Sequence, residues 1–329
     1  MLKKLTIAFA ASAAALLAAT TSGVAQTKLK WAHVYETSEP FHTASVWAAG
    51  EIGKRTNGRY AIDVYPASQL GKETDINQGL ALGSVDMIIS GSSFAAKSYP
   101  PIGVTYYPYT FRDADHLLAY TKSDVFKELT KGYEDKTGHR ILAVTYYGVR
   151  HTSSNKAIKT CADMKGLKIR VPDVPAYLAM PRACGANTAP IAFAEVYLAL
   201  QNGTVEAQEN PLTTIEAKKF YEVQKHMAMT NHMWSGFNLM ANLALWRKLP
   251  ADIQAVIERN ATKYVRLQRE DQGAFNGGLR MTLTERGMLF NDVNQEQFRA
   301  RMAPVYAVWK EKLGTKCWSL LEGHVGKLG

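Results

Sequence analysis

An alternation of strand and helix patterns runs through the first hundred residues, and it restricts the fold more than any other feature of the chain. LKWAHV (residues 29–34) and YAIDVYP (60–66) are predicted strands, and FHTASVWAAGEIGKRTNG (41–58) has helical spacing. The order repeats in ETDINQGLALGSVDMIISGSS (73–93), where a helix ends at Gly83 and VDMII forms a short buried strand. This alternation is typical of α/β proteins, so we expect a largely parallel sheet covered by helices.

The chain is long enough for two domains, since about 304 residues follow the N-terminal segment described next. The pattern changes from strand-like to mixed polar and aromatic around residues 145–150 and 230–240, which we interpret as crossings between domains. A helical pattern of roughly thirty residues begins near Pro250 and is long enough to span both domains. The predicted division is residues 26–147 plus 236–275 for domain I, and residues 148–235 plus 276–329 for domain II.

The first 25 residues have the pattern of a secretory signal peptide. Lys3 and Lys4 precede an uncharged run, Leu5–Ala19, and the small residues SGVA follow. A run of 15 residues is short for a transmembrane helix. We therefore expect cleavage after Ala25 and an exported, soluble mature chain.

The charge of the chain is positive but dispersed. The formal net charge of +10 falls to +8 once Lys3 and Lys4 are removed, and no run of five or more Lys or Arg occurs. This pattern argues against a nucleic-acid partner. A modest positive excess suits an anionic small ligand, although solubility alone would also explain it.

The residue patterns of common exported enzymes are missing from the sequence. GxSxG, HExxH, GxxxxGK[ST] and a GxGxxG that opens a helix are all absent. His226 and His232 are six residues apart, which does not place two metal ligands on one helical face. Glu36 and Glu39 could do acid–base work, but solvated carboxylates on a loop are the commoner case. We expect no catalytic residues, metal site or cofactor.

Three polar residues come at the predicted ends of strands and suggest a carboxylate-binding site. Arg150 ends one strand, Arg170 in LKIRVP ends the next, and Asn210 ends a third just before Pro211. Ligands of open α/β sheets collect outside the carboxyl ends of the strands. An arginine fork can hold a carboxylate through two bonds, and an asparagine amide can donate and accept beside it. A solvated arginine at a strand end is the alternative for Arg170.

The order of motifs resembles the solute-binding proteins of TRAP transporters, the DctP-like family, over nearly the whole mature chain. The motifs are LKWAH, YPASQLG, GSVDM, GVRHTSSNKAI, ADMKGLKIRVP, APIAFAEVYLALQNGTVEAQENP and FYEVQKHMAMTNH. The resemblance implies a periplasmic binding protein with two α/β domains, a hinge, a long helix that crosses both and a ligand cleft between them. It also implies delivery of an organic acid to membrane permease subunits. We expect a monomer.

The resemblance assigns roles to residues at matching positions. Arg170 matches the arginine that pairs with the ligand carboxylate, Arg150 a second arginine near that group, and Asn210 the asparagine of the pocket. Phe193 resembles the aromatic wall, and Asp173 occupies a variable position that faces the ligand in some relatives. Relatives that bind sialic acid have a glutamate where this chain has Ser90, Gly91, Ser92 and Ser93, which argues against sialic acid.

The further pocket candidates are polar and suit a ligand with many hydroxyl groups: His33, Glu36, Glu39, Ser90, Ser92, Tyr147, His151 and Asp173. Stretches HVYETSEPFHTASVW and SGSSFAAKSYPPIGVTYYP are similar to members that bind hexuronates. We therefore expect D-glucuronate or D-galacturonate as the ligand. A C4-dicarboxylate or another hydroxy acid is the alternative within the family, and an exported enzyme acting on a carboxylate sugar is the alternative of another class.

Three cysteines, Cys161, Cys184 and Cys317, leave two possibilities open: one disulfide with one remaining thiol, or three free thiols. Cys161 lies in the turn before the strand of residues 167–171. The helix after Pro172 should return toward the start of that strand near Cys184. We therefore expect that, if a disulfide forms, it joins Cys161 to Cys184.

Overall fold

The structure is a computed structural model that describes residues 26–328, apart from the side chains of residues 268 and 270–277. The predicted signal peptide, residues 1–25, lies outside this range. The described strands are β1 (Thr27–Ala32), β2 (Tyr60–Tyr65), β3 (Met87–Gly91), β4 (His139–Ser154), β5 (Lys168–Val171), β6 (Asn187–Pro190), β7 (Ala207–Asn210), β8 (His226–Asn242) and β9 (Leu289–Asp292).

Helices precede and follow most of these strands. The described α-helices are α1 (Pro40–Arg55), α2 (Glu73–Leu82), α3 (Ser92–Ala95), α4 (Ala114–Tyr120), α5 (Asp124–Thr137), α6 (Pro175–Ala183), α7 (Val196–Gln201), α8 (Leu212–Ala217), α9 (Leu243–Lys248), α10 (Ala251–Glu285), α11 (Gln295–Ala300), α12 (Ala303–Leu313) and α13 (Thr315–Val325). Short 3-10 helices are η1 (Pro100–Tyr106), η2 (Cys161–Met164), η3 (Phe193–Glu195) and η4 (Phe220–Glu222).

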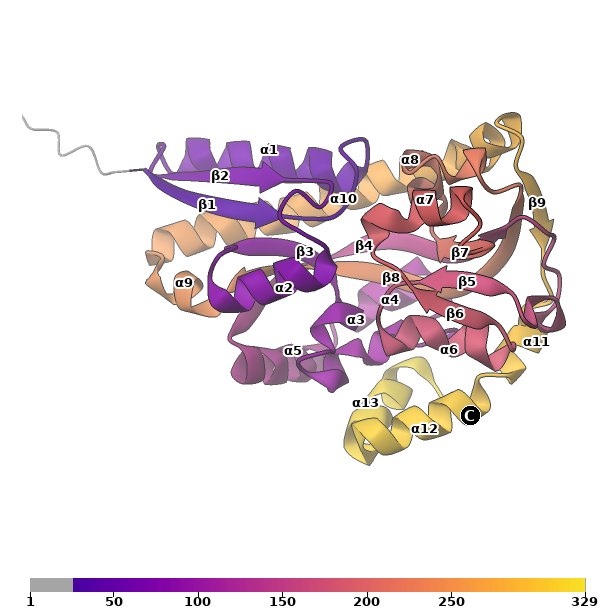
Figure 1. Cartoon of the computed structure of the whole chain (residues 1–329). Helices are drawn as coiled ribbons and strands as arrows, with labels where there is room; N and C mark the ends of the chain where they lie inside the picture. The colour runs from indigo at the N-terminus through magenta and orange to yellow at the C-terminus, as the bar shows by residue number, and fades with distance from the viewer. Residues whose placement is uncertain (1–25, 329) are drawn as a thin grey trace, which may run out of the picture.

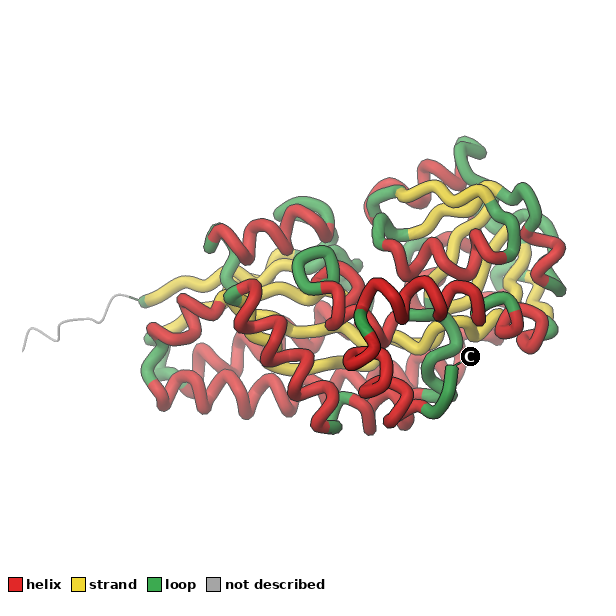
Figure 2. Tube along the Cα trace, turned by 90° about the horizontal axis from the view of Figure 1, so that it is seen from below, coloured by secondary structure: helices red, strands yellow, loops and turns green. Residues whose placement is uncertain are grey.

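The described strands form one sheet in the order β2-β1-β3-β8-β4-β7-β5-β6, with β9 beside β8. The two longest strands, β4 and β8, have 16 and 17 residues and run antiparallel to each other. The C-terminal part of β8 pairs with β3, and the C-terminal part of β4 pairs with β7. They therefore connect two lobes, lobe 1 with β1, β2 and β3, and lobe 2 with β5, β6, β7 and β9 (Figure 1). Seen from below, the lobes stand side by side with helices on their outer faces (Figure 2).

The predicted crossings around residues 145–150 and 230–240 lie in the middle of β4 and β8. The pairing of these strands shifts register between Tyr146 and Gly148, and again between Arg150 and Thr152. An extra residue in one strand bends it and increases its twist. The sheet therefore changes direction where the chain passes from lobe 1 to lobe 2.

Strand pairing is mixed, which corrects the expectation of a largely parallel sheet. β1 runs parallel to β2 and β3, and β5 runs parallel to β6 and β7. The two crossing strands, in contrast, are antiparallel to β3, to β7 and to each other. The sequence GVRHTSS (148–154) continues past Arg150, the predicted end of a strand, and belongs to β4. It lacks apolar alternation because its polar side chains are buried and hydrogen-bonded; Ser153, for example, donates to Gln224 Oε1 at 3.1 Å.

The helices of lobe 1 follow their sequence patterns closely. α1 buries Phe41, Ala44, Ala48 and Ile52, which recur every three or four residues on the face that packs on β2 and α10. α2 ends at Gly83, whose φ of 75° is in the left-handed region that ends many helices and that residues with a Cβ seldom adopt. The helical boundaries near Gly83 are therefore set locally.

The predicted long helix is confirmed as α10, with 35 residues. It packs against α1 in lobe 1 and against α8 and β9 in lobe 2, and it extends from beside α9 to beside β9 (Figure 1). A rigid helix that contacts both lobes limits the directions in which they can move relative to each other.

The C-terminal helices differ from the predicted division, which grouped residues 276–329 with domain II. α13 packs on η1 and α5 of lobe 1. In α12, the Tyr306 hydroxyl donates to the carbonyl of Pro108 at 2.5 Å, and the Trp309 ring lies 4.9 Å from that of Tyr107. These contacts follow from aromatic residues on α12 and α13 that the helical pattern alone could not assign to a lobe. The chain thus returns to lobe 1 after α11.

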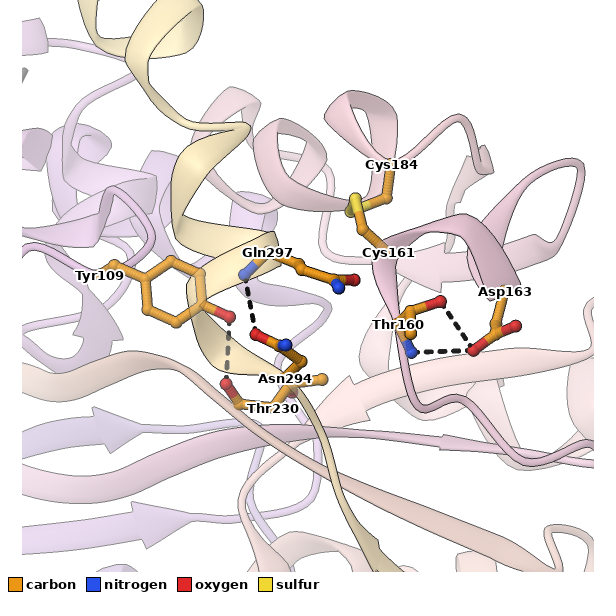
Figure 3. Close-up of a disulfide and its surroundings, with 8 residues drawn as sticks. All are labelled: Tyr109, Thr160, Cys161, Asp163, Cys184, Thr230, Asn294 and Gln297. Carbon is orange, nitrogen blue, oxygen red and sulfur yellow. Dashed lines mark hydrogen bonds between the residues drawn. A yellow bond between two sulfur atoms is a disulfide. The ribbon is translucent and has the colours of Figure 1, made fainter.

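A disulfide joins Cys161 and Cys184, the pair expected from the turn before the strand of residues 167–171 and the return of the next helix, with an S–S distance of 2.00 Å (Figure 3). It connects η2 to the C-terminal end of α6. Cys317 is free and buried on α13. The disulfide therefore holds α6 to the segment that precedes β5.

Candidate functional site

A cavity of about 240 Å³ lies between the lobes and continues inward toward Arg150 and Asn210. Residues of both lobes line it. Lobe 1 contributes Tyr35, Glu73 and Phe94, and lobe 2 contributes Arg170, Pro172, Phe193 and Asn210. A molecule in this cavity therefore contacts both lobes at once.

Arg170 is the third residue of β5 and is 2% exposed. Its Nε donates to the carbonyl oxygen of Ile191 at 2.9 Å, whereas its Nη1 has no hydrogen-bond partner among the described residues. Burial, followed by the positive charge of Arg150, lowers the pKa of Arg170 to about 10, against the opposing effect of nearby carboxylates. A buried guanidinium with a free donor is costly unless an anion pairs with it. Arg170 is thus suited to receive a carboxylate.

Arg150, in contrast, is already paired. It lies inside β4 rather than at a strand end, and it holds Glu209 through Nε–Oε2 at 2.5 Å and Nη2–Oε1 at 2.9 Å. Its guanidinium also lies over the Tyr177 ring, 4.8 Å from the centroid. Burial opposes the charge on Arg150, but Glu209 outweighs it and raises the pKa of this arginine. Its charge is therefore neutralised within the protein.

Glu209 connects Arg150 to a histidine. Its Oε2 lies 3.1 Å from Nε2 of His232. Burial favours the neutral acid, but Arg150 and His232 hold the pKa of Glu209 below its ordinary value. The buried group is thus an ion pair with an additional hydrogen-bond partner, the arrangement in which a buried carboxylate is tolerated.

Asn210, the last residue of β7, is fixed by its neighbours. Its Oδ1 accepts from Nη2 of Arg150 at 2.8 Å, and its Nδ2 donates to Gln208 Oε1 at 2.6 Å. Arg150 therefore orients the Asn210 amide at the cavity wall, while Arg170 supplies the unpaired cation. The three residues predicted to bind a carboxylate, Arg150, Arg170 and Asn210, therefore lie together at the cavity. The two arginines differ in their tasks, because Arg150 is paired within the protein and Arg170 is not.

Glu73 is a cavity residue that sequence reasoning missed. It is the first residue of α2, and its Oε1 accepts from the Ser90 hydroxyl at 3.2 Å and from the Gly91 amide at 3.4 Å. Burial raises its pKa to about 7, although these hydrogen bonds oppose the shift. In the sequence KETD, an acidic residue at the start of a helix is explained by its favourable interaction with the helix dipole. The sequence therefore gives no sign that Glu73 lines a cavity. Its carboxyl group faces Arg170 across the cavity and can accept hydroxyl hydrogen bonds.

Aromatic rings form the walls of the cavity. Phe193 and Tyr147, both predicted pocket residues, line it together with Tyr35 and Phe237. The Tyr35 ring lies 6.2 Å from that of Phe193 and 4.9 Å from that of Phe237. The Tyr147 hydroxyl is hydrogen-bonded to Thr214. Flat apolar walls beside a few polar groups are typical of small-molecule sites.

Six predicted contacts lie outside the residues that line the cavity: His33, Glu36, Glu39, Ser90, Ser92 and His151. The two serines form a layer behind the wall. Ser90 donates to Glu73, and Ser92 accepts from Asn238 Nδ2 at 2.9 Å. These hydroxyl groups are used within the protein, so they act on a ligand through their neighbours.

The two histidines are buried and uncharged. His33 Nδ1 accepts from the backbone amide of Tyr35 at 3.3 Å, and its other ring nitrogen lies 3.3 Å from His42. Burial lowers the pKa of His33 and of His151 to about 3 in each case. Both rings therefore stay neutral at physiological pH and serve the packing around the cavity.

The acidic candidates Glu36 and Asp173 connect the lobes. Glu36 of lobe 1 pairs with Lys218 of lobe 2 at 2.7 Å, and Asp173 of lobe 2, at the cavity mouth, pairs with Lys97 of lobe 1 at 2.8 Å. Glu39 is buried, and its Oε2 accepts from the Thr214 hydroxyl at 3.4 Å. The pairs Glu36–Lys218 and Asp173–Lys97 therefore each bridge the two lobes.

No group of three or more side chains that could hold a metal ion is present within residues 26–328 as described. Among the same residues, no helix is both long and apolar enough to cross a membrane.

Comparison with known proteins identifies the family to which the chain belongs. The family model described as bacterial extracellular solute-binding protein, family 7, matches residues 31–312. A TRAP periplasmic solute-binding protein from Roseobacter denitrificans, solved with bound L-galactonate, is 31% identical with a TM-score of 0.85; the match covers 90% of this chain and 98% of that one. A Citrobacter koseri protein solved with bound D-glucuronate is 26% identical with a TM-score of 0.86, covering 91% and 99%.

A curated relative has a different stated ligand. The C4-dicarboxylate-binding periplasmic protein DctP of Rhodobacter capsulatus is 30% identical over 290 residues, which cover 87% of this chain and 84% of that protein. The family match and these relatives extend over both lobes and the cavity between them. The chain belongs to the family 7 bacterial extracellular solute-binding proteins, the DctP family of TRAP transporters.

Proposed function

We propose that the cavity captures a six-carbon sugar acid, D-glucuronate or D-galacturonate, and that the protein delivers it to the membrane permease of a TRAP transporter. The observation that carries the proposal is the buried Arg170, whose Nη1 has no partner among the described residues. A ligand carboxylate would pair with it by a charge-assisted hydrogen bond.

The wall opposite Arg170, where Glu73 lies, favours a ligand that also has hydroxyl groups. Glu73 of lobe 1 offers carboxyl oxygens, whereas Arg170 and Asn210 of lobe 2 offer donors. A hexuronate has a carboxylate at one end and a ring of hydroxyls elsewhere, and the ring can lie against Phe193. Only a ligand that interacts with both lobes favours the arrangement in which they meet.

L-galactonate is a second candidate, because the 31% identical relative was solved with it. The open-chain acid has the same two chemical features, a carboxylate and several hydroxyls. Succinate offers carboxylates but no hydroxyl group that could donate to Glu73, so it should bind more weakly. A C4-dicarboxylate is the alternative ligand, because the Rhodobacter capsulatus relative is a C4-dicarboxylate-binding protein.

A thermal-shift panel of D-glucuronate, D-galacturonate, L-galactonate, succinate, sialic acid and glucose tests the proposal. A true ligand at a hundred times its dissociation constant stabilises the protein by about 2.7 kcal/mol. We expect a sugar acid to give the largest shift and neutral glucose almost none. A response to succinate alone would move the assignment to C4-dicarboxylates, and a response to glucose would contradict the role of Arg170. Recovery of the bound sugar acid unchanged would separate capture from turnover.

The proposed location is the periplasm, after removal of residues 1–25. Family membership supports a periplasmic protein, and the sequence of the first 25 residues supports cleavage after Ala25. Intact-mass measurement of the exported protein tests this. A mature mass that includes Lys3 and Lys4 would contradict the proposed processing.

A further inference from the structure

A second and wider groove lies apart from the sugar-acid cavity, between α6 and α12. Its volume is about 820 Å³. α6 contributes Leu178 and Ala179, and α12 contributes Val305, Val308 and Trp309. Val308 is 49% exposed and lies beside Val305 and Trp309, so the apolar side chains of α12 form a continuous patch rather than a single exposed residue. The floor of the groove is thus apolar and open to solvent.

The groove is built from both lobes. α6 follows β5 and is held by the disulfide at Cys184, so it belongs to lobe 2. α12 is held to lobe 1 by the contacts of Tyr306 and Trp309 with the segment that contains Tyr107. The two walls therefore approach each other only when the lobes do. The shape of the groove therefore depends on how the two lobes are arranged around the sugar-acid cavity.

A smaller apolar cavity of about 170 Å³ adjoins the inner end of the groove. The two share Pro175 and Trp309, and the smaller one also includes Tyr107 and Val174. A deep apolar pocket beside a shallow groove is the usual place for one large anchoring side chain of a partner. Its position between the lobes gives it the same dependence on their arrangement.

Three cations surround the apolar floor: Arg182 on α6, and Arg301 and Lys312 before and on α12. All three are exposed, and none forms an ion pair with a described residue. Arg182 Nε donates to Thr188 at 3.0 Å, and the Lys312 ammonium lies 4.9 Å from the Trp309 ring centre. The rim thus has an uncompensated positive charge, which complements an acidic partner and repels a second copy of the same basic surface.

We infer that this groove is the docking site for an acidic amphipathic helix of the membrane permease. Carboxylates of that helix pair with Arg182, Arg301 and Lys312, and one large apolar side chain enters the smaller cavity. That the partner is the permease rests on the proposed delivery role.

Charge reversal tests the inference. The groove variant is Arg182→Glu with Lys312→Glu, and the matched control is Arg247→Glu with Lys248→Glu. All four residues are exposed cations in the last turn of a helix, and the control pair lies on α9, at the far end of lobe 1 (Figure 1). Each variant is purified for the thermal-shift panel and also expressed in place of the parent in the bacterium that makes the protein.

The groove variant should keep the parent's thermal shift with the sugar acid, while uptake of that compound by the cells falls by about tenfold or more. The control should keep both properties. Uptake at the parent's rate in cells with the groove variant would overturn the inference. Loss of the thermal shift in that variant would also overturn it, because the groove would then be part of the sugar-acid site.

A cross-linking measurement does not depend on which ligand binds. Val308→Cys places a thiol on the groove floor, and a benzophenone maleimide attached there is irradiated with membranes that contain the permease. We expect a cross-link to a permease subunit that disappears when Arg182→Glu and Lys312→Glu are added and persists with the α9 control pair. Absence of that cross-link, or its persistence in the groove variant, contradicts docking here. Failure of every sugar acid in the panel would leave this result unaffected, so the two proposals fail separately.

Discussion

Replacing Arg170 by methionine should strengthen the empty protein and abolish its ligand binding. Burial lowers the pKa of this arginine to about 10, well below its ordinary value. At 1.36 kcal/mol per pKa unit, the fold disfavours the cation by about 3 kcal/mol, and because the folded pKa is the lower one, this cost is fully present at pH 7. Loss of the hydrogen bond to Ile191 offsets it by about 1 kcal/mol. The ligand-free variant should therefore be more stable by about 1–2 kcal/mol, or a few degrees in Tm.

The same substitution removes the partner of the ligand carboxylate. Truncating one member of a buried charge pair costs about 2–5 kcal/mol, a loss of about thirtyfold to several thousandfold in affinity. Arg170→Lys should lose nearly as much, because an ammonium cannot reproduce the two donors of the fork.

Calorimetric titration with the best sugar acid, and thermal unfolding without it, measure both effects. Arg247→Met on the surface of α9 is the control, and it should change neither quantity. If Arg170→Met binds the sugar acid as the parent does, the cation is not the carboxylate partner. If the ligand-free variant is instead less stable by several kcal/mol, Arg170 serves the fold and the reasoning from its unpaired donor is wrong.

The other predictions concern groups around the site. Glu209→Gln should destabilise the protein by about 3–5 kcal/mol in urea unfolding, because Arg150 would keep a buried charge without its carboxylate; a loss below 1 kcal/mol would argue against a buried ion pair. Thiol titration of the denatured, unreduced protein should find one reactive cysteine, and reduction of Cys161–Cys184 should cost about 3 kcal/mol for its 23-residue separation; three reactive thiols without reductant would exclude the disulfide. Burial raises the pKa of Glu39 in the folded protein from 4.5 to about 7, so the fold favours its neutral form. The parent should therefore lose stability relative to Glu39→Gln as the pH rises from about 4.5 to 7, with little further change above that. Equal pH profiles of Tm for the two proteins would contradict that pKa.

Several features could be predicted from the sequence because they depend on local chemistry. Strand–helix alternation indicated an α/β protein, Gly83 at the end of LALG marked the end of α2, and helical spacing after Pro250 predicted α10. The turn before LKIRV and the return of the next helix limited the disulfide to one pair. Arg170 was selected as a candidate because it comes at the end of an apolar strand, just before the chain turns at Pro172.

Other features were decided only when distant segments came together. Arg150 and Arg170 look alike in the sequence, but Glu209 on β7 neutralises one and leaves the other unpaired. Glu73 has an ordinary position at a helix N-terminus, and only the fold turns it toward Arg170.

The polar strand GVRHTSS and the lobe of α12 and α13 were also outside the reach of sequence patterns. The pattern of apolar and polar residues indicates whether a side chain meets apolar surface or water. The buried polar residues of β4 meet neither: Ser153, for example, is hydrogen-bonded to Gln208 of β7 and to Gln224 just before β8. The sequence of an amphipathic helix shows that one face is apolar, but it does not show which part of the protein covers that face. The charge state of each arginine, the facing of Glu73 and the groove between α6 and α12 all depend on which segment lies opposite, and that is a property of the tertiary structure alone.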